Sequence, residues 1–196
     1  MLAIVNSGVA NISSVMFAFE RIGANPVLTD DPKLLRKADK IVLPGVGAAK
    51  SAMDNLNAKG LVDTIKSLEN PVLGICLGMQ ILFKNSQEGN VDCLSLIDGN
   101  IKHIPEKTGF TIPHMGWNQL NIIDDKNPLF NNIDNGSNVY FVHSYYAPVT
   151  DDTIASTDYI VPITASVKRG NFYGCQFHPE KSGDIGAKIL KNFIEL

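Results

Sequence analysis

The chain has 196 residues, a formal net charge of −3 and 44% hydrophobic residues, as is usual for one globular domain. A single domain over residues 1–196 is expected, large enough to bury a core without disulfides or a structural metal. The acidic balance argues against a nucleic-acid surface, which needs a basic excess. No stretch approaches the roughly 20 apolar residues of a membrane span, and the opening MLAIVNSG lacks the basic region of a signal peptide.

The cysteines bear on location and on metal binding. Cys76, Cys93 and Cys175 are odd in number and show no C-x-x-C spacing, which disfavours both a disulfide framework and a zinc site. We therefore expect a cytoplasmic protein that needs no metal and no other cofactor.

The first half of the chain alternates short apolar runs with amphipathic segments, which predicts parallel strands covered by helices. Strands are expected at LAIV, PVLT, KIVLP and PVLGIC, which are residues 2–5, 26–29, 40–44 and 71–76. The segment 11–23 is predicted to be an amphipathic helix with Asn11 as its N-cap and Gly23 as its end. Weaker helical patterns cover 31–38 and 47–60.

A further helix is expected to begin at ICLGMQILFK, and after it the pattern becomes β-like. Strands are predicted within residues 120–123, 139–149, 163–169 and 172–177, followed by a last helix over 184–195. The fold class is therefore α/β, with a mostly parallel central sheet, added antiparallel strands and helices on both faces. Ligands of such sheets bind at the carboxyl ends of strands, so PGVGA, GICLG and FHPE are expected to share one edge.

Gly74, Cys76 and Gly78 form a G-x-C-x-G motif where a strand is expected to turn into a helix. This is the thiol version of the nucleophile elbow, in which a strained backbone presents the nucleophile and the residues two positions away must be small. A helix N-terminus there would favour a thiolate. The alternative is a buried structural thiol.

A thiol nucleophile needs a histidine base and a group that orients the imidazole, and QFHPE offers both. Pro179 biases His178 toward an extended backbone, in which residues 178 and 180 project to the same side. Glu180 is thus expected to orient His178. The alternative is a loop histidine beside a solvated carboxylate.

The other histidines carry less information. His103 is expected on the surface of a strand, and His114 and His143 in the core or at an interface. No pair of histidines has the i, i+4 spacing of metal ligands on a helix.

LPGVGAAKS is glycine-rich but matches no nucleotide-binding motif, because Ala49 precedes Lys50 where a Walker A motif requires glycine. Acyl transfer requires backbone N–H donors around a developing oxyanion. Val46 and Gly47 are expected to supply one donor, and Leu77, just after the cysteine, the other. The alternative is an ordinary tight turn.

The order PGVG, GICLGMQ and FHPE resembles that in class I glutamine amidotransferases, whose glutaminase domain uses a Cys-His-Glu triad. PHMGWN, YFVHSYY, NFYGCQFHPEKSG and the terminal AKILKNFIEL resemble, more narrowly, the glutaminase subunits of imidazole glycerol phosphate synthases of histidine biosynthesis. The resemblance covers nearly the whole chain and implies the three-layer, flavodoxin-like fold of that family.

The resemblance implies that L-glutamine is hydrolysed through a γ-glutamyl thioester on Cys76, with His178 as base and then acid and Glu180 as the third member. It implies that the substrate is held by four residues, Gly45, Gln80, Ser144 and Tyr145.

The resemblance also implies that the ammonia passes into a (β/α)₈-barrel synthase subunit, which forms imidazole glycerol phosphate and an aminoimidazole carboxamide ribotide. Four residues would face this partner: Asn11, Met115, Trp117 and Tyr140. For these four, aromatic core packing or helix capping is an equally good interpretation. The family is weakly active until the synthase side is occupied, so we hypothesise that a peptide flip in the turn 45–47 completes the oxyanion hole.

Two places depart from the family pattern. Asn6, followed by Ser7, stands where many relatives have an acidic residue that closes the first strand. Cys175 replaces a usually aliphatic residue and is expected to pack as a small hydrophobe close to the active site. Two other functions stay open. One is a glutaminase that serves pyridoxal phosphate, anthranilate or guanylate synthesis, and the other is a binding module with an inert cysteine.

Overall fold

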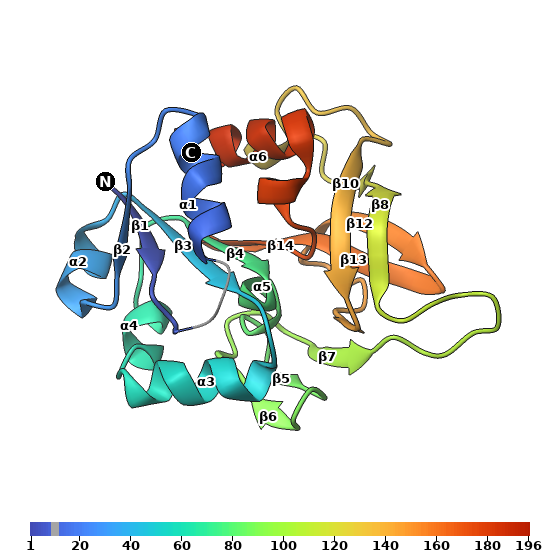
Figure 1. Cartoon of the computed structure of the whole chain (residues 1–196), viewed down its shortest axis with the longest axis horizontal. Helices are drawn as coiled ribbons and strands as arrows, with labels where there is room; N and C mark the ends of the chain where they lie inside the picture. The colour runs from blue at the N-terminus through green and yellow to red at the C-terminus, as the bar shows by residue number, and fades with distance from the viewer. Residues whose placement is uncertain (9–11) are drawn as a thin grey trace.

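The described residues form a main sheet of eight strands that is parallel over most of its width (Figure 1). The computed structural model describes residues 1–8 and 12–196, so the predicted helix cap Asn11 lies outside the described residues. The strands of this sheet are β1 (Leu2–Val5), β2 (Pro26–Thr29), β3 (Lys40–Gly45), β4 (Val72–Cys76), β9 (Asn121–Ile122), β12 (Thr153–Tyr159), β13 (Val161–Arg169) and β14 (Phe172–Cys175).

The strand order across the main sheet is β2-β1-β3-β4-β14-β13-β12-β9. The five strands from β2 to β14 pair in parallel, and β13, β12 and β9 continue the sheet with antiparallel pairing. The predicted α/β class, with a mostly parallel sheet and added antiparallel strands, is confirmed.

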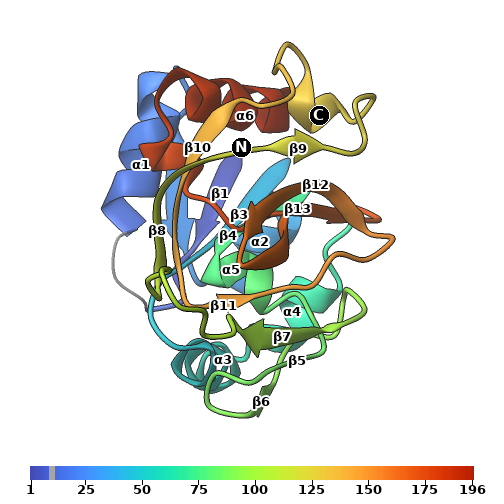
Figure 2. The same cartoon turned by 90° about the vertical axis from the view of Figure 1, so that its right-hand side faces the viewer.

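Helices cover both faces of the sheet, which gives three layers (Figures 1 and 2). One face carries α1 (Ile12–Arg21) and α6 (Gly183–Glu195), and the other carries α2 (Pro32–Lys37), α3 (Ala49–Ala58) and α4 (Val62–Lys66). Within the described ranges, α6 is the longest helix with 13 residues, and no helix there has the length and apolar character that a membrane crossing requires.

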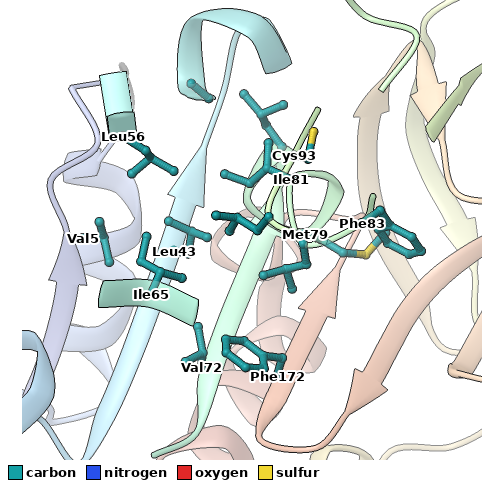
Figure 3. Close-up of a cluster of buried hydrophobic side chains, with 14 of the residues drawn as sticks. Val5, Leu43, Leu56, Ile65, Val72, Met79, Ile81, Phe83, Cys93 and Phe172 are labelled. Atoms are coloured by element: carbon teal, nitrogen blue, oxygen red, sulfur yellow. The ribbon is translucent and has the colours of Figure 1, made fainter. Parts of the chain in front are cut away.

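The alternation of side chains along β1 divides the core into two clusters. Val5 points to the α3 side and packs in a cluster with Leu56, which Figure 3 shows from close by. Ile4 points to the opposite face and packs in the cluster that contains Phe19 of α1 and Phe193 of α6. Burying one such side chain stabilises the fold by about 1.5–3 kcal/mol relative to leaving it exposed.

Shorter elements lie beside the main sheet. Strands β8 (His114–Gln119) and β10 (Asn138–His143) form an antiparallel pair. A small sheet contains β5 (Asn85–Ser86), β6 (Val91–Asp92), β7 (Asn100–His103) and β11 (Tyr145–Tyr146). Single turns of helix are α5 (Leu77–Gln80), η1 (Pro128–Phe130) and η2 (Pro179–Lys181).

The prediction of a long helix after the cysteine is wrong, because α5 ends after one turn, at Gln80. The carbonyl groups that would continue the helix are used by a later segment of the chain. Ile81 O accepts from Leu94 N, Leu82 O from Leu96 N, and Phe83 O from Ser95 N, each at 2.9 Å. These long-range bonds turn the chain away toward β5.

Strands β8 and β12 were not predicted from the sequence. For β12, the composition of the strand explains why. Its sequence TIASTDY lacks the apolar alternation of a strand, yet its first five residues are buried. The buried hydroxyl of Thr153 is satisfied across the hairpin by Thr164, with 2.8 Å between the two Oγ1 atoms. Paired hydroxyl groups therefore occupy positions where the sequence pattern expects apolar side chains.

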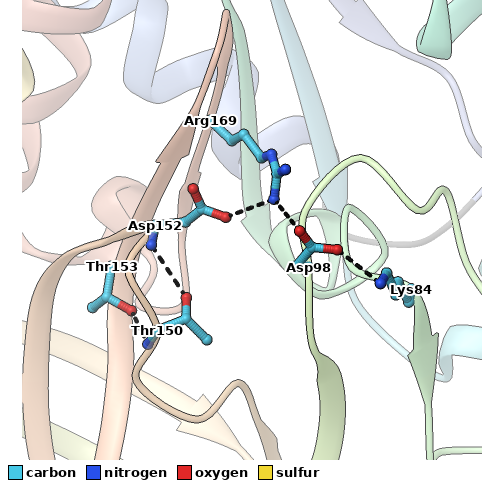
Figure 4. A network of polar contacts seen from close by, with 6 residues as sticks. All are labelled: Lys84, Asp98, Thr150, Asp152, Thr153 and Arg169. Atoms are coloured by element: carbon cyan, nitrogen blue, oxygen red, sulfur yellow. Dashed lines mark hydrogen bonds and ion pairs between the residues drawn. The ribbon is translucent and has the colours of Figure 1, made fainter.

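A surface network joins the β12–β13 hairpin to the segment after β6 (Figure 4). Arg169 contacts Asp98 at 2.6 Å and Asp152 at 3.1 Å, and Lys84 contacts Asp98 at 2.8 Å. Contacts with Lys84 and Arg169 lower the pKa of Asp98 to about 2. Because these charged groups lie at the surface, salt screens their interactions, and the network contributes little to the stability of the fold.

Candidate active site

Three neighbouring parallel strands end at the same edge of the sheet and bring the three predicted motifs together. In the pairing register, Gly45 at the end of β3 lies opposite Cys76, and Cys175 at the end of β14 lies opposite Ile75. A cavity of about 370 Å³ opens there. It is lined by Val46, Gly47, Cys76, Leu77, Gln80, Glu88, Pro113, Val142, His143, Ser144, Tyr145, His178 and Lys181. The expected common edge is confirmed.

Cys76 has the strained backbone of a nucleophile elbow, with φ 53° and ψ −111°. The glycines of the motif permit this corner. A Cβ on Gly78 would lie 1.8 Å from Leu43 O, and a Cβ on Gly74 would lie 2.6 Å from Gly78 O. No larger residue fits at either position without moving backbone, so the G-x-C-x-G spacing is a packing requirement of the corner.

Among the described residues, two groups lie within hydrogen-bond range of the Cys76 sulfur. The side-chain amide of Gln176 donates to Sγ at 3.8 Å, and Val142 O lies 3.9 Å from Sγ. Gln176 is fully buried, so its amide has no competing solvent. Gln176 was not predicted from the sequence, because its position near the sulfur depends on β14 lying beside β4.

His178 and Glu180 form a buried pair, with 2.7 Å between Nδ1 and Oε1 and side chains only 3% and 1% exposed. A carboxylate only accepts, so Nδ1 carries a hydrogen and Nε2 is left for the cavity. Among the residues described, Nε2 has no hydrogen-bond partner. The expected contact forms, but Glu180 lies in the turn η2 and not in an extended segment.

The backbone around His178 is held in place from two sides. His178 N donates to Tyr140 O at 2.9 Å, and Ser182 Oγ donates to His178 O at 2.7 Å. Gly186 lets α6 approach the turn, because a Cβ there would lie 1.9 Å from Pro179 O. The imidazole is thus fixed by strand β10 and by helix α6.

The charge state of His178 follows from its two neighbours. Burial opposes the charged imidazolium, but interactions with nearby Cys76 and with the Glu180 carboxylate outweigh it and raise the pKa of His178 to about 10. The ring is therefore charged at neutral pH. Cys76 and His178 line the same cavity, so the imidazole is placed to exchange a proton with a group that reacts there.

Glu180→Gln should lower the pKa of His178, because the neutral amide no longer stabilises the imidazolium. In the wild type the folded-state pKa of about 10 lies above the unfolded value of about 6.5. The pair therefore stabilises the fold fully below pH 6.5, and this stabilisation is lost as the pH rises through 10. NMR titration of the His178 ring measures the shift. The exposed Glu195→Gln serves as the control, and an unchanged pKa in Glu180→Gln would contradict the assignment.

The predicted backbone donors line the cavity beside the sulfur. Val46 and Gly47 follow β3 directly, and Leu77 follows Cys76. Gly47 has φ +95° with open space where a Cβ would be, whereas a Cβ on Gly45 would lie 2.9 Å from Gly78 N. Of the residues described, the cavity-lining set does not include Gly45, which packs behind it against the elbow.

The three other residues expected to hold the substrate, Gln80, Ser144 and Tyr145, line the cavity. Gln80 Nε2 donates to Tyr145 O and to Gln176 Oε1, both at 2.8 Å. The amide hydrogens of Gln80 are thus used inside the protein, and they join two walls of the cavity.

Glu88 and Lys181 also line the cavity and were not identified from the sequence. The Glu88 carboxylate accepts a hydrogen bond from Ala49 N at 2.9 Å, at the start of α3. Partial burial raises the pKa of Glu88. No sequence motif around Glu88 indicates this role, because Glu88 reaches the cavity only through the tertiary contact between residues 86–89 and α3.

Three of the residues expected to face a partner gather on one side of the β8–β10 pair, and we call them the β8–β10 patch: Met115, Trp117 and Tyr140. Met115 and Trp117 are 62% and 59% exposed. Tyr140 lies opposite Trp117 in the register, with ring centroids 6.0 Å apart. The fourth, Asn11, lies outside the described residues.

The remaining expectations concern single residues. Cys175 is fully buried and packs as a small hydrophobe, and His103 is exposed at the end of β7, as expected. His114 and His143 are buried. Asn6 uses its carbonyl oxygen to accept from Lys59 Nζ at 2.8 Å. Over residues 1–8 and 12–196, no cluster of three or more His, Cys, Asp or Glu side chains could hold a metal ion.

The chain matches the family model "Glutamine amidotransferase class-I" over residues 5–196. It is 47% identical to the imidazole glycerol phosphate synthase subunit HisH of Bacteroides fragilis over 196 residues, which cover 100% of this chain and 99% of that protein. It is 49% identical to the HisH subunit of Haemophilus influenzae strain Rd over 194 residues, or 99% and 96% of the two chains.

Solved structures share the fold at lower identity. A putative GMP synthase protein from Thermoplasma acidophilum superposes with a TM-score of 0.75 at 19% identity, covering 100% of this chain and 92% of that one. PurLQS from Thermotoga maritima gives a TM-score of 0.72 at 21% identity, with coverage of 99% and 97%. The match to the family model and the full-length identity to HisH subunits show that the chain belongs to the class I glutamine amidotransferases and, within them, to the family of HisH subunits.

Proposed function

We propose that this chain is the glutaminase subunit of an imidazole glycerol phosphate synthase. It hydrolyses L-glutamine to glutamate and ammonia, and it delivers the ammonia to a (β/α)₈-barrel subunit that forms imidazole glycerol phosphate and aminoimidazole carboxamide ribotide. The observation that carries the proposal is that Cys76 and His178 line one cavity and that Glu180 contacts His178. The 47–49% identity to HisH subunits supports the choice of synthase.

The first half of the reaction begins when the proton of the Cys76 thiol is transferred to His178, which gives a thiolate and an imidazolium. The Cys76 thiolate attacks the carboxamide carbon of glutamine, and the backbone N–H groups of the 46–47 turn and of Leu77 receive the developing oxyanion. As the tetrahedral intermediate collapses, the C–N bond breaks and the His178 imidazolium gives its proton to the leaving nitrogen, so that ammonia departs. The γ-glutamyl thioester remains on the sulfur.

In the second half, His178 is neutral and accepts a proton from a water molecule as its oxygen attacks the thioester carbon. The C–S bond then breaks, and glutamate and the starting thiolate–imidazolium pair are regenerated. Glu180 keeps the ring oriented and stabilises its charged form through both steps.

Other polar groups that line the cavity suit the amino-acid part of glutamine. The Glu88 carboxylate can pair with the α-ammonium group, and Ser144 and Tyr145 supply neighbouring hydrogen-bonding groups. Glutamine, whose amino-acid part carries an ammonium and a carboxylate group, would thereby be oriented with its carboxamide toward Cys76.

Gly47→Val tests whether the turn 45–47 must rotate to complete the oxyanion hole. Valine rarely adopts the φ of +95° that Gly47 has. We expect partner-stimulated kcat to fall by up to about 10²–10³-fold, as for a lost oxyanion donor, while the Kd for glutamine stays nearly constant. Stopped assays measure kcat, and calorimetry on the inactive Cys76→Ser background measures the Kd for glutamine. Equal losses in both would contradict the hypothesis.

The β8–β10 patch fits the barrel subunit, since exposed Met and Trp side chains are enriched at interfaces. Strand β10 also connects the patch to the catalytic base, because Tyr140 O accepts from His178 N. Binding of a partner at the patch can therefore bear directly on the triad. A cytoplasmic location, where thiols stay reduced, suits a reactive cysteine.

The function is tested by measuring glutamate and ammonia release with and without the nucleotide substrate and the barrel subunit. We expect turnover that rises when both are added, and incorporation of the released nitrogen into the nucleotide product. Trp117→Ala should weaken co-purification with the barrel, whereas Ile123→Ala, a comparably exposed residue outside the patch, should not. Stimulation by another synthase instead would reassign the acceptor, and no turnover with any partner would reject the proposal.

A further inference from the structure

Two buried histidines lie beside the cavity and take no part in the hydrolysis described above. His114 and His143 are opposite one another in the β8–β10 register, on the side away from the β8–β10 patch. They are only 3% and 6% exposed, and 2.9 Å separates His114 Nδ1 from His143 Nε2. Buried imidazoles at such close range must have matched donors and acceptors.

The hydrogen positions follow from the partners at each end. His143 Nδ1 is 2.8 Å from Tyr145 O, and a carbonyl only accepts, so this nitrogen carries the hydrogen. Burial lowers the pKa of His143 to about 3 and that of His114 to about 4, so both rings are neutral near pH 7. His143 Nε2 is then an acceptor, and His114 must donate to it through Nδ1.

The far end fixes the second ring in the same way. Asn118 Oδ1 accepts from Gln119 N and Asn118 Nδ2 donates to Asp158 O, which sets the orientation of this amide. Its other hydrogen is available to His114 Nε2, 3.2 Å away. The rings of Phe141 and Tyr159 both stack on His114, at centroid distances of 4.8 and 4.1 Å.

The near end continues to the nucleophile. The Tyr145 carbonyl that accepts from His143 also accepts from Gln80 Nε2, which in turn donates to Gln176 Oε1. The amide of Gln176 donates to Cys76 Sγ. A continuous series of hydrogen bonds thus joins Asn118 on β8, through both histidines, to the wall that holds the sulfur, and the Tyr145 carbonyl accepts from both sides of it.

We propose that His114 and His143 are positioning residues for glutamine hydrolysis, which act as neutral Nδ1–H tautomers to fix the Tyr145 carbonyl and, through Gln80 and Gln176, the amide that faces the Cys76 sulfur. The inference rests on the proposed glutaminase function. An imidazole suits the role because one rigid ring accepts on one side and donates on the other. Loss of the His143 bond leaves the Tyr145 carbonyl held by Gln80 alone, so both can rotate.

The first test is NMR of the wild-type protein with nitrogen-15 labelled histidine. We expect both rings to carry hydrogen on Nδ1 and none on Nε2 near pH 7, although a free histidine side chain favours the opposite tautomer. An Nε2–H form or a charged ring at either residue would overturn the proposal. This measurement needs no variant and no turnover.

The second test compares substitutions at position 143. His143→Phe removes both hydrogen bonds, whereas His143→Asn keeps a donor near the Tyr145 carbonyl. We expect iodoacetamide alkylation of Cys76 and kcat/KM in His143→Phe to fall by about 10- to 100-fold, the size of the penalty for leaving a buried polar group without its hydrogen bond. His143→Asn should restore a large part of both.

Thr157→Val is the control, because the described structure gives this buried hydroxyl no hydrogen-bond partner. It should match the wild type in both assays. Wild-type alkylation and kcat/KM in His143→Phe, or equal damage in His143→Asn, would overturn the proposal. If the glutaminase function itself were wrong, the wild type would show no turnover. The tautomers of the two histidines and the alkylation rates of Cys76 would still test the hydrogen-bond series between Asn118 and the sulfur.

Discussion

Cys76→Ala is expected to abolish glutamine hydrolysis while leaving the fold intact. Alanine lacks the nucleophile, and no other cysteine can replace it because Cys93 and Cys175 are buried elsewhere in the two core clusters. The turnover number should fall by about 10⁴-fold or more, as for the loss of a catalytic nucleophile. Ammonia release measures the rate, and mass spectrometry of the wild type during turnover should detect the thioester on the peptide that contains residue 76.

Cys93→Ala and Cys175→Ala are the matched controls. Burial raises the pKa of Cys93 to about 11 and that of Cys175 to about 12, so both stay protonated thiols at neutral pH. A glutamine-analogue electrophile should label the wild type and both controls at a single site, and should not label Cys76→Ala. Labelling at Cys93 or Cys175, or normal turnover in Cys76→Ala, would contradict the assignment of the nucleophile.

The parts of the site that could be predicted are those written into short stretches of sequence. Gly74 and Gly78 flank the cysteine because the corner has no room for a Cβ, so the motif and the geometry carry the same information. The common edge of the three motifs follows from parallel strands, whose carboxyl ends point the same way. Contact between His178 and Glu180 required only that the two residues lie in one local segment.

What could not be predicted depends on contacts between distant segments. Gln176 reaches the sulfur because β14 is inserted beside β4, a pairing that no local pattern specifies. Glu88 reaches the cavity because residues 86–89 pack on the start of α3, where a Cβ on Gly89 would lie 2.7 Å from Lys50 Cβ. The early end of α5 has the same origin, since its next carbonyls accept from residues 94–96. Tertiary hydrogen bonds overrode the local helical preference in that segment.

Gly78→Ala is expected to produce the largest loss of stability of any single methyl addition at the active-site corner. The new Cβ would lie 1.8 Å from Leu43 O and 2.8 Å from Leu43 C. Leu43 lies in β3, which pairs with both β1 and β4, so this backbone cannot retreat without breaking sheet hydrogen bonds. We expect the free energy of unfolding in urea to fall by about 3 kcal/mol or more, at the upper end of overpacking effects.

Gly60→Ala separates this clash from the general effect of replacing glycine. Gly60 has φ +63° and open space around its Cβ position, so its substitution adds only backbone strain of about 1–2 kcal/mol. A larger loss in Gly78→Ala than in Gly60→Ala is therefore the measure of the clash. Folded Gly78→Ala protein should also lose alkylation of Cys76, because the elbow can accept the methyl group only by abandoning the strained φ of 53°. Equal stability of the two variants, with normal alkylation, would show that the corner is less tightly packed than the distances from Gly78 to Leu43 require.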